Sequence, residues 1–372
     1  MCLDFGDIAY EESVEEVLRL VESAGVRRHR VVHGRRKRPD SRLYAGSGKV
    51  EEIAGAAAEL NAASVVFNHD LSPAQGRNLE RELKRRVIDR TELILEIFAQ
   101  RAKTSEGKLQ VELAQLERLS TRLVRGWTHL ERQRGGLGKT GGPGEKQIEL
   151  DRRYITKRVR VLNDRIETLK KQRAVQRRSR ARGDVLSVSI VGYTNAGKST
   201  LFNALARARA YEADQLFATL DTTTRKVWLP RAGSVVLSDT VGFIRDLPHG
   251  LVAAFRATLE ETVRADLLLH VVDASSAARE AQITEVGKVL AEIGADQVPQ
   301  IAVWNKIDAV GKGNELNAGS ERDQYGRISR VFVSARTGAG LEELRGALAG
   351  FARNRAAARG AAVVEAQPLQ SH

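Results

Sequence analysis

Cysteine is nearly absent from this chain of 372 residues, which contains only Cys2. A single thiol excludes an intrachain disulfide and a cluster of cysteine metal ligands, and it fits a reducing compartment. The seven histidines show no ligand spacing. We therefore expect His129 and His270 to be structural residues.

Long apolar runs are missing too. No run approaches the roughly 20 residues that cross a bilayer, and residues 1–10 carry Asp4 and Asp7 but no lysine or arginine. This pattern argues against a transmembrane helix and against a signal peptide. We expect a cytoplasmic monomer, with peripheral membrane association left open.

Positive charge is in excess, with 60 Lys and Arg against 47 Asp and Glu, a net charge of +13. Residues 145–182 hold 14 basic and 5 acidic residues, or +9 of that excess. Such a segment favours a polyanionic partner, because each phosphate contact releases counterions. We expect RNA rather than DNA; the alternative is an ordinary solvated helix face.

The first region, residues 1–102, alternates helical and strand patterns and predicts a small α/β domain. Ser72-Pro73 is a typical helix start. The expected strands are 30–33, 64–67 and 87–89, and the expected helices are 13–24, 50–60, 72–84 and 92–100.

The second region, residues 103–183, predicts a long antiparallel helical hairpin. Each arm carries one apolar seam, and residues 135–144, with six glycines in ten positions, separate the arms as a loop. We expect this basic glycine loop to contact RNA. The seams are Leu109, Leu113, Leu116, Leu123 and Leu130 in one arm and Ile155, Val159, Leu162, Ile166 and Leu169 in the other.

The third region, residues 184–352, alternates apolar strands with helices. The strands expected at 185–191, 235–237, 267–272, 300–304 and 330–333 predict a mainly parallel sheet covered on both faces. Residues 353–372 show no clear core pattern and are expected to form a helix end and a tail.

A phosphate-binding loop lies at the start of this third region, between a strand and a helix. Its backbone N–H groups and the helix N-terminus favour phosphate, and Lys198 is expected to reach the β- and γ-phosphates. Ser199 is expected to bind Mg²⁺. The predicted contacts are Gly192, Tyr193, Thr194, Asn195, Ala196, Gly197, Lys198, Ser199 and Thr200.

Three further motifs follow at strand ends, as a nucleotide site of an α/β sheet requires. Asp239 can hold Mg²⁺, and Gly242 can offer its N–H to the γ-phosphate. Asp308 can accept from guanine but not from adenine, which favours GTP over ATP. The motifs are Asp239, Thr240, Val241 and Gly242; Asn305, Lys306, Ile307 and Asp308; and Ser334, Ala335 and Arg336.

These motifs resemble those of the translation-factor-related GTPases. The resemblance implies a switch I threonine, for which Thr219 is our choice, with Thr222, Thr223 and Thr224 as competitors. We assign Lys198, Thr219 and Gly242 to catalysis and Ser199, Thr219 and Asp239 to Mg²⁺. Switch I nucleotide contacts are expected from Phe217, Ala218, Thr219, Leu220 and Asp221.

The first two regions are similar to the HflX family. The resemblance runs from about residue 25 to about residue 350, and the family implies a GTPase that binds the large ribosomal subunit and splits ribosomes under stress. The alternatives are an assembly or quality-control GTPase for that subunit, and an RNA-binding protein whose nucleotide site matters little. The shared motifs are YAGSGKVEEI (44–53), VFNHDLSPAQGRNLE (66–80), VIDRT (87–91), EIFAQRA (96–102) and GEKQIELDRR (144–153).

A second phosphate-loop fragment, Gly46 to Lys49, lies in the first region. Position 43 is Leu43, where a complete motif would carry glycine. We expect a compact turn here; an ATP site is the alternative.

Phe243 stands where glutamine-dependent GTPases orient the attacking water, and a phenyl ring cannot do so. We predict slow GTP turnover by the protein alone, because a partner must complete the site. Asn195 occupies the position of the K⁺-binding asparagine of potassium-activated GTPases. This position implies that K⁺ stimulates GTP turnover. Phosphate release at low salt, in K⁺ and in Na⁺, checks both expectations. Fast turnover would contradict the first, and equal rates in the two salts the second.

Overall fold

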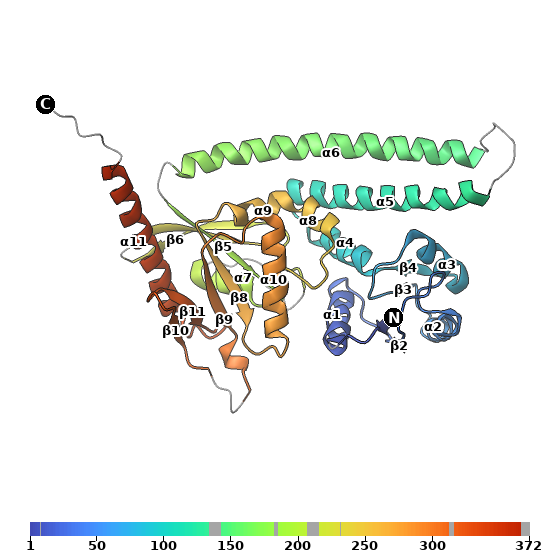
Figure 1. Ribbon diagram of the computed structural model, residues 1–372, viewed down its shortest axis with the longest axis horizontal. Coiled ribbons are helices and arrows are strands. Elements are labelled where there is room, and N and C mark those ends of the chain that lie inside the picture. The colour runs from blue at the N-terminus through green and yellow to red at the C-terminus, as the bar shows by residue number, and fades with distance from the viewer. Residues whose placement is uncertain are drawn as a thin grey trace. The chain divides into compact units, whose positions relative to one another are not determined.

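The computed structural model describes residues 1–7, 9–133, 143–181, 185–206, 216–230, 232–311 and 316–365. The chain divides into two compact units. Unit 1 comprises Met1–Gln172, Gln215–Phe217 and Leu247–Phe255. Unit 2 comprises Arg173–Asp214, Ala218–Asp246 and Arg256–His372. Figure 1 labels the elements of both.

Unit 1 contains two parallel strand pairs joined through Met1. The Met1 N–H₃⁺ group donates to Val66 O at 2.6 Å, and the Met1 carbonyl accepts from Asn68 N at 3.0 Å. The first strand was not expected, and the second lies three residues beyond the predicted start at Arg30. The pairs are β1 (Cys2–Asp4) with β2 (His33–Arg35) and β3 (Ser64–Val66) with β4 (Arg86–Ile88).

The helices of this small α/β domain follow the predicted pattern. Ser72 caps the third helix: its hydroxyl accepts from Gln75 N, and the Gln75 side chain accepts from Ser72 N. Pro73 takes the first helical position. The helices are α1 (Tyr10–Ser23), α2 (Ser47–Glu59), α3 (Pro73–Leu83) and α4 (Arg90–Arg101).

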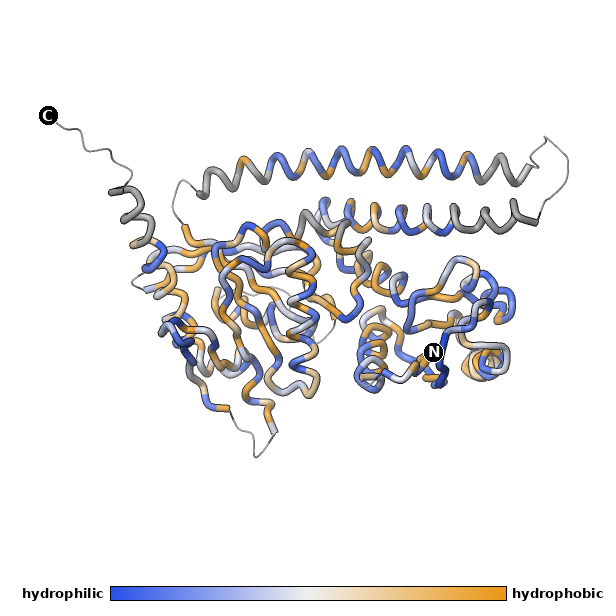
Figure 2. The backbone as a smooth tube through the Cα atoms, viewed as in Figure 1, coloured by the Kyte–Doolittle hydropathy of each residue, from blue (hydrophilic) through white to orange (hydrophobic). Residues whose placement is uncertain are grey.

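Two long helices, α5 (Ser105–Gln133) and α6 (Pro143–Ala181), occupy the ranges of the predicted arms. Leu162 and Ile166 of the second seam are buried, and Arg158 of α6 pairs with Glu112 of α5 at 2.7 Å. Figure 2 shows the described part of α6 as mostly hydrophilic with hydrophobic residues at intervals. Most of the predicted loop, 135–142, lies outside the described residues, as do the side chains of Leu123, Trp127, His129 and Leu130.

Phe98 of α4 anchors an aromatic cluster in unit 1. Its ring meets those of Phe217 and Phe255 edge to face, with centroids 4.7 and 4.9 Å away. All three rings are buried. Phe255 follows α8 (His249–Ala254), so segments distant in sequence share this core.

Unit 2 is an α/β domain around a seven-stranded sheet. The strand order is β10-β11-β9-β8-β5-β7-β6, and only the outer pairs β10–β11 and β6–β7 are antiparallel. The prediction of a mainly parallel sheet is confirmed. The strands are β5 (Leu186–Gly192), β6 (Thr223–Leu229), β7 (Gly233–Asp239), β8 (Leu267–Asp273), β9 (Gln300–Asn305), β10 (Gly319–Arg322) and β11 (Ile328–Phe332).

Helices α7, α9, α10 and α11 contact the strands of this sheet. Arg345 of α11 donates to the carbonyls of Ala204 and Leu205, which ties α11 to α7. The last helix continues beyond residue 352, where a helix end and tail were expected. The helices are α7 (Lys198–Ala206), α9 (Arg256–Val263), α10 (Arg279–Ile293), the 3₁₀ turn η1 (Ile307–Ala309) and α11 (Leu341–Glu365).

Membrane insertion finds no support in these helices. Over the part of the chain that the structure describes, none combines the length and the apolar character that a bilayer span requires.

The buried histidine of β8 gives a pH prediction. Burial, assisted by the Lys198 charge, lowers the pKa of His270 from 6.5 to about 4. Between pH 6.5 and pH 4, His270 therefore binds a proton in the unfolded chain and stays neutral in the folded chain. The stability contributed by neutral His270 is present above pH 6.5 and is lost as the pH falls to 4. The full contribution to the free energy of unfolding is on the order of 3 kcal/mol.

Thermal unfolding of the protein and of a His270→Leu variant, from pH 7.5 to 4.5, measures this contribution. The variant is expected to lose less stability on acidification, because its side chain cannot take up a proton. Parallel loss in both proteins would contradict the prediction.

Candidate nucleotide site

The phosphate-binding loop connects the buried strand β5 to α7 in unit 2. Gly197 has a φ of 88°, and a Cβ there would collide with the Asn305 side chain. Lys198 is buried, and its Nζ donates to Tyr193 O at 2.8 Å. Burial lowers the pKa of Lys198 to about 8. The loop thus holds a desolvated amine at a helix N-terminus, which suits a phosphate group.

Three predicted Mg²⁺ ligands meet in one cluster. Asp239 Oδ2 accepts from Ser199 Oγ at 2.7 Å and from Thr219 Oγ1 at 2.9 Å, and the two hydroxyls are 2.8 Å apart. Asp239 is 1 % exposed, and burial raises the pKa of its carboxyl group. Asp239 Oδ1 is buried without a hydrogen-bond partner among the described residues. The cluster contains only oxygen donors.

Thr219 is the switch I threonine that the geometry favours. Thr224 directs its hydroxyl toward Ser238 Oγ at 3.2 Å, and Thr223 lies on β6 in register with Asp239. Phe217, expected at the nucleotide, instead packs its ring against Phe98 in unit 1. The aromatic ring finds an apolar core there, which explains the difference.

Asn305, which belongs to the motif expected to bind the guanine base, bonds two backbone segments. Its Nδ2 donates to Ala196 O at 2.9 Å, and its Oδ1 accepts from Ala335 N at 2.9 Å. We expected Asn305 to bond the base and a backbone N–H at Ser334-Ala335 to meet guanine O6. In this structure the two groups bond each other, which ties the phosphate loop to the segment that follows β11, and their contacts with guanine stay predictions. Asp308 is exposed on η1.

Asp273 is a site residue that the sequence reasoning missed. Its Oδ2 lies 2.7 Å from Lys306 Nζ, and its Oδ1 accepts from Ser275 N at 3.0 Å and Ser275 Oγ at 2.6 Å. Lys306 holds a left-handed φ of 64°. Its place in the sequence could have identified it, because Asp273 follows an apolar strand as Asn305 does. Asp273 ends β8 and is in register with Asn305 on the neighbouring strand.

Phe243 bonds to the phosphate-binding loop through its backbone. Phe243 N donates to Gly192 O at 3.1 Å, and Phe243 O accepts from Thr194 N at 2.7 Å. Arg245 N donates to the Tyr193 hydroxyl at 2.8 Å. Phe243 is fully buried.

The remaining predicted contacts are spread around this edge of the sheet. The Thr240 hydroxyl donates to Ile190 O at 2.7 Å, which gives it a bracing role. Leu220 and Val241 are buried, and Arg336 is exposed. The individual nucleotide contacts of these residues stay predictions.

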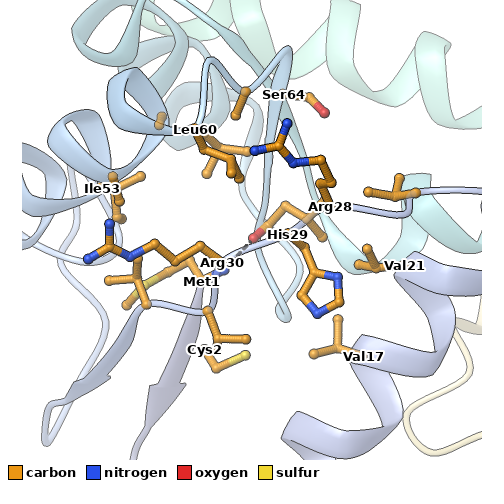
Figure 3. Close-up of a pocket in the computed structure, with 18 of the residues that line it drawn as sticks. Met1, Cys2, Val17, Val21, Arg28, His29, Arg30, Ile53, Leu60 and Ser64 are labelled. Carbon is orange, nitrogen blue, oxygen red and sulfur yellow. Dashed lines mark hydrogen bonds between the residues drawn. The ribbon is translucent and has the colours of Figure 1, made fainter.

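Unit 1 has a separate cavity of about 140 Å³ (Figure 3). Apolar side chains such as Val17, Val21 and Ile53 line it, and so do Arg28 and Arg30. The fragment from Gly46 to Lys49 does not line this cavity. That fragment begins α2, and Lys49 Nζ bonds His33 O and Glu52. A helix start thus replaces the expected turn.

Comparisons with known proteins match nearly the whole chain. Family models described as "GTP-binding GTPase N-terminal", "GTP-binding GTPase Middle Region" and "50S ribosome-binding GTPase" match residues 11–99, 101–180 and 187–306. GTPase HflX of Escherichia coli (strain K12) is 55% identical over 91% of this chain and 78% of its own length. GTPase HflX of Magnetococcus marinus is 49% identical over 90% and 77%.

A solved structure is similar as well. The complex of SsGBP with GDP has a TM-score of 0.51 and 27% identity, over 92% of this chain and 96% of that one. This similarity supports the arrangement of a nucleotide-binding sheet with a preceding N-terminal domain.

Asp273 gives the prediction for this site. Asp273→Asn removes the charge that orients Lys306 while keeping an acceptor for Ser275. We expect affinity for GDP and for GTP to fall equally, by about 3- to 10-fold, because one charge-assisted hydrogen bond is removed. Fluorescent-nucleotide titration measures both affinities.

Asp266→Asn is the matched control. Asp266 precedes the opposite end of β8, where it accepts from Ser187 N and pairs with Arg355. Its loss should lower stability without a change in GDP affinity. Equal nucleotide affinities in Asp273→Asn and the unmodified protein would refute the role of Asp273.

Proposed function

The chain belongs to the HflX family of GTPases, and we propose that it uses GTP hydrolysis to bind the large ribosomal subunit and to split or rescue ribosomes under stress. The observation that carries the proposal is the set of exposed arginines along α6, in a chain that also holds a complete set of nucleotide motifs.

Mg²⁺ fits the Asp239 cluster. The donors are one carboxylate and two hydroxyl oxygens, which suit a hard cation, and the buried Asp239 Oδ1 has no hydrogen-bond partner within the described ranges. Ser199, Thr219 and Asp239 would hold the ion. Bound there, Mg²⁺ neutralises charge on the β- and γ-phosphates.

The chain's own groups account for the rest of the reaction. Lys198 and the backbone N–H groups of the loop would bind the phosphates, and Gly242 would offer its N–H to the γ-phosphate. Because the buried Phe243 ring cannot orient water, the protein alone would hydrolyse GTP slowly. Thr219 belongs to switch I (217–221) and Gly242 to switch II (around 239–247), so loss of the γ-phosphate would release both segments.

Ribosomal RNA is the partner that α6 favours. Arg152, Arg160 and Arg165 are exposed and make no ion pair within the described residues. Three unpaired guanidinium groups on one helix suit a phosphate backbone. The glycine-rich residues 135–144 at the end of this arm would approach RNA closely because they carry few side chains.

Ribosome splitting and large-subunit assembly share this chemistry and differ in substrate. Sedimentation of intact ribosomes with protein and GTP separates them. Conversion of joined ribosomes to subunits supports splitting. Intact ribosomes, with binding to free large subunits only, would favour the assembly role.

The ribosomal partner gives a quantitative prediction. We expect purified large subunits to raise GTP turnover strongly in K⁺ buffer. Replacing Arg152, Arg160 and Arg165 together by glutamine should weaken subunit binding. It should also reduce the slope of log affinity against log salt by about 1 for each phosphate group that an arginine no longer neutralises. Binding across a salt series measures the slope.

Replacing the same three residues by lysine is the matched control, because it keeps the charge. Near-normal salt dependence in the lysine variant and a shallow slope in the glutamine variant are expected. Unchanged binding in the glutamine variant would move the RNA-binding surface away from this part of α6.

A further inference from the structure

The third residue of the phosphate-binding loop, Thr194, carries an orphan polar atom. Its side chain is 6 % exposed, and its Oγ1 is buried without a hydrogen-bond partner among the described residues. A buried hydroxyl that bonds nothing destabilises the folded state. Such an atom in a folded protein calls for a partner that the free chain does not supply.

The surroundings of Thr194 identify the partner's position. A Cβ added to Gly242 would lie 2.8 Å from Thr194 Cγ2 and 2.9 Å from Lys198 Nζ. Thr194 and the Lys198 amine therefore both border Gly242, and Gly242 and Lys198 are the groups expected to meet the γ-phosphate. Its methyl group faces Gly242, and rotation about Cα–Cβ exchanges the methyl and the hydroxyl.

The backbone of Thr194 is committed elsewhere. Thr194 N donates to Phe243 O at 2.7 Å, and that bond fixes the residue against switch II. The hydroxyl is thus the part of Thr194 that remains to serve a ligand. Phe243 also stands in place of the usual glutamine, so the site lacks that polar side chain near the γ-phosphate.

We propose that the Thr194 hydroxyl is a catalytic donor to the γ-phosphoryl group of GTP. This inference rests on the family's GTPase activity and is independent of the ribosomal role. During hydrolysis the oxygen of water bonds to the γ-phosphorus, and the bond from that phosphorus to the β–γ bridging oxygen breaks. GDP leaves with that electron pair on its terminal oxygen, and the inorganic phosphate that forms carries both protons of the water. Thr194 keeps its proton and donates a hydrogen bond to a γ-oxygen as charge on it redistributes.

Thr194→Val tests the proposal, because valine keeps the shape and removes the hydroxyl. We expect single-turnover hydrolysis of bound GTP to fall on the order of 10- to 100-fold, as for the loss of one transition-state donor. GDP affinity should stay within about 2-fold, since GDP lacks the γ-phosphate. The thermal midpoint of the nucleotide-free protein should stay constant or rise, because a buried orphan is removed.

Thr262→Val is the matched control in the same unit. Thr262 is also fully buried, but its hydroxyl has a partner, Ser189 Oγ, at 3.3 Å. Its loss should lower the thermal midpoint by a few degrees and leave hydrolysis of bound GTP unchanged. The two threonines are thus expected to give opposite patterns.

Thr194→Ser restores the hydroxyl without the methyl and should recover most of the rate that valine loses. Hydrolysis by Thr194→Val within about 2-fold of the unmodified rate would overturn the proposal, since a transition-state donor must affect the rate. An equal loss of GDP and GTP binding, or a slow serine variant, would also overturn it in favour of a packing role. These outcomes concern hydrolysis by the protein alone, so they do not depend on whether ribosomes stimulate GTP turnover.

Discussion

The burial of the Asp239 carboxylate is the constraint on which the nucleotide site depends. At 1 % exposure it has lost its water, and an isolated charge there would be very unfavourable. Hydroxyl groups from the phosphate-binding loop and from switch I partly replace that water. One buried carboxylate thereby joins β7, α7 and the segment before β6, and it leaves an oxygen for a cation. The position of Thr219 follows from this requirement.

A second set of contacts closes switch II against the same loop. Phe243 exchanges backbone hydrogen bonds with Gly192 and Thr194, while its ring takes part in the core. A residue at the position of the usual glutamine thus contributes backbone order and apolar packing, and it leaves the chemistry to other groups. Because Phe243 supplies no polar side-chain group near the γ-phosphate, the hydroxyl of Thr194 is the group that we propose acts there.

Unit 1 shows the same combination of apolar anchoring and charge. Phe217 of switch I and Phe255, which follows α8, insert into an aromatic core around Phe98. At the other end of α4, the buried Asp89 caps the helix and pairs with Arg118 and Arg122 of α5. Two arginines on one carboxylate fix the middle of α5, because a buried charge requires geometrically good partners.

The sequence by itself determined the parallel sheet, the order of the nucleotide motifs, the apolar seams of the long helices and the start of α3. These features depend on local periodicity, on glycine and on capping residues, which act over a few positions. Tertiary structure alone decided which threonine meets Asp239, that Phe217 leaves the site for an aromatic core, that Asn305 braces the backbone and that Asp273 orients Lys306. Each of these depends on contacts between strands and segments far apart in the chain, and the pattern within a segment does not encode them.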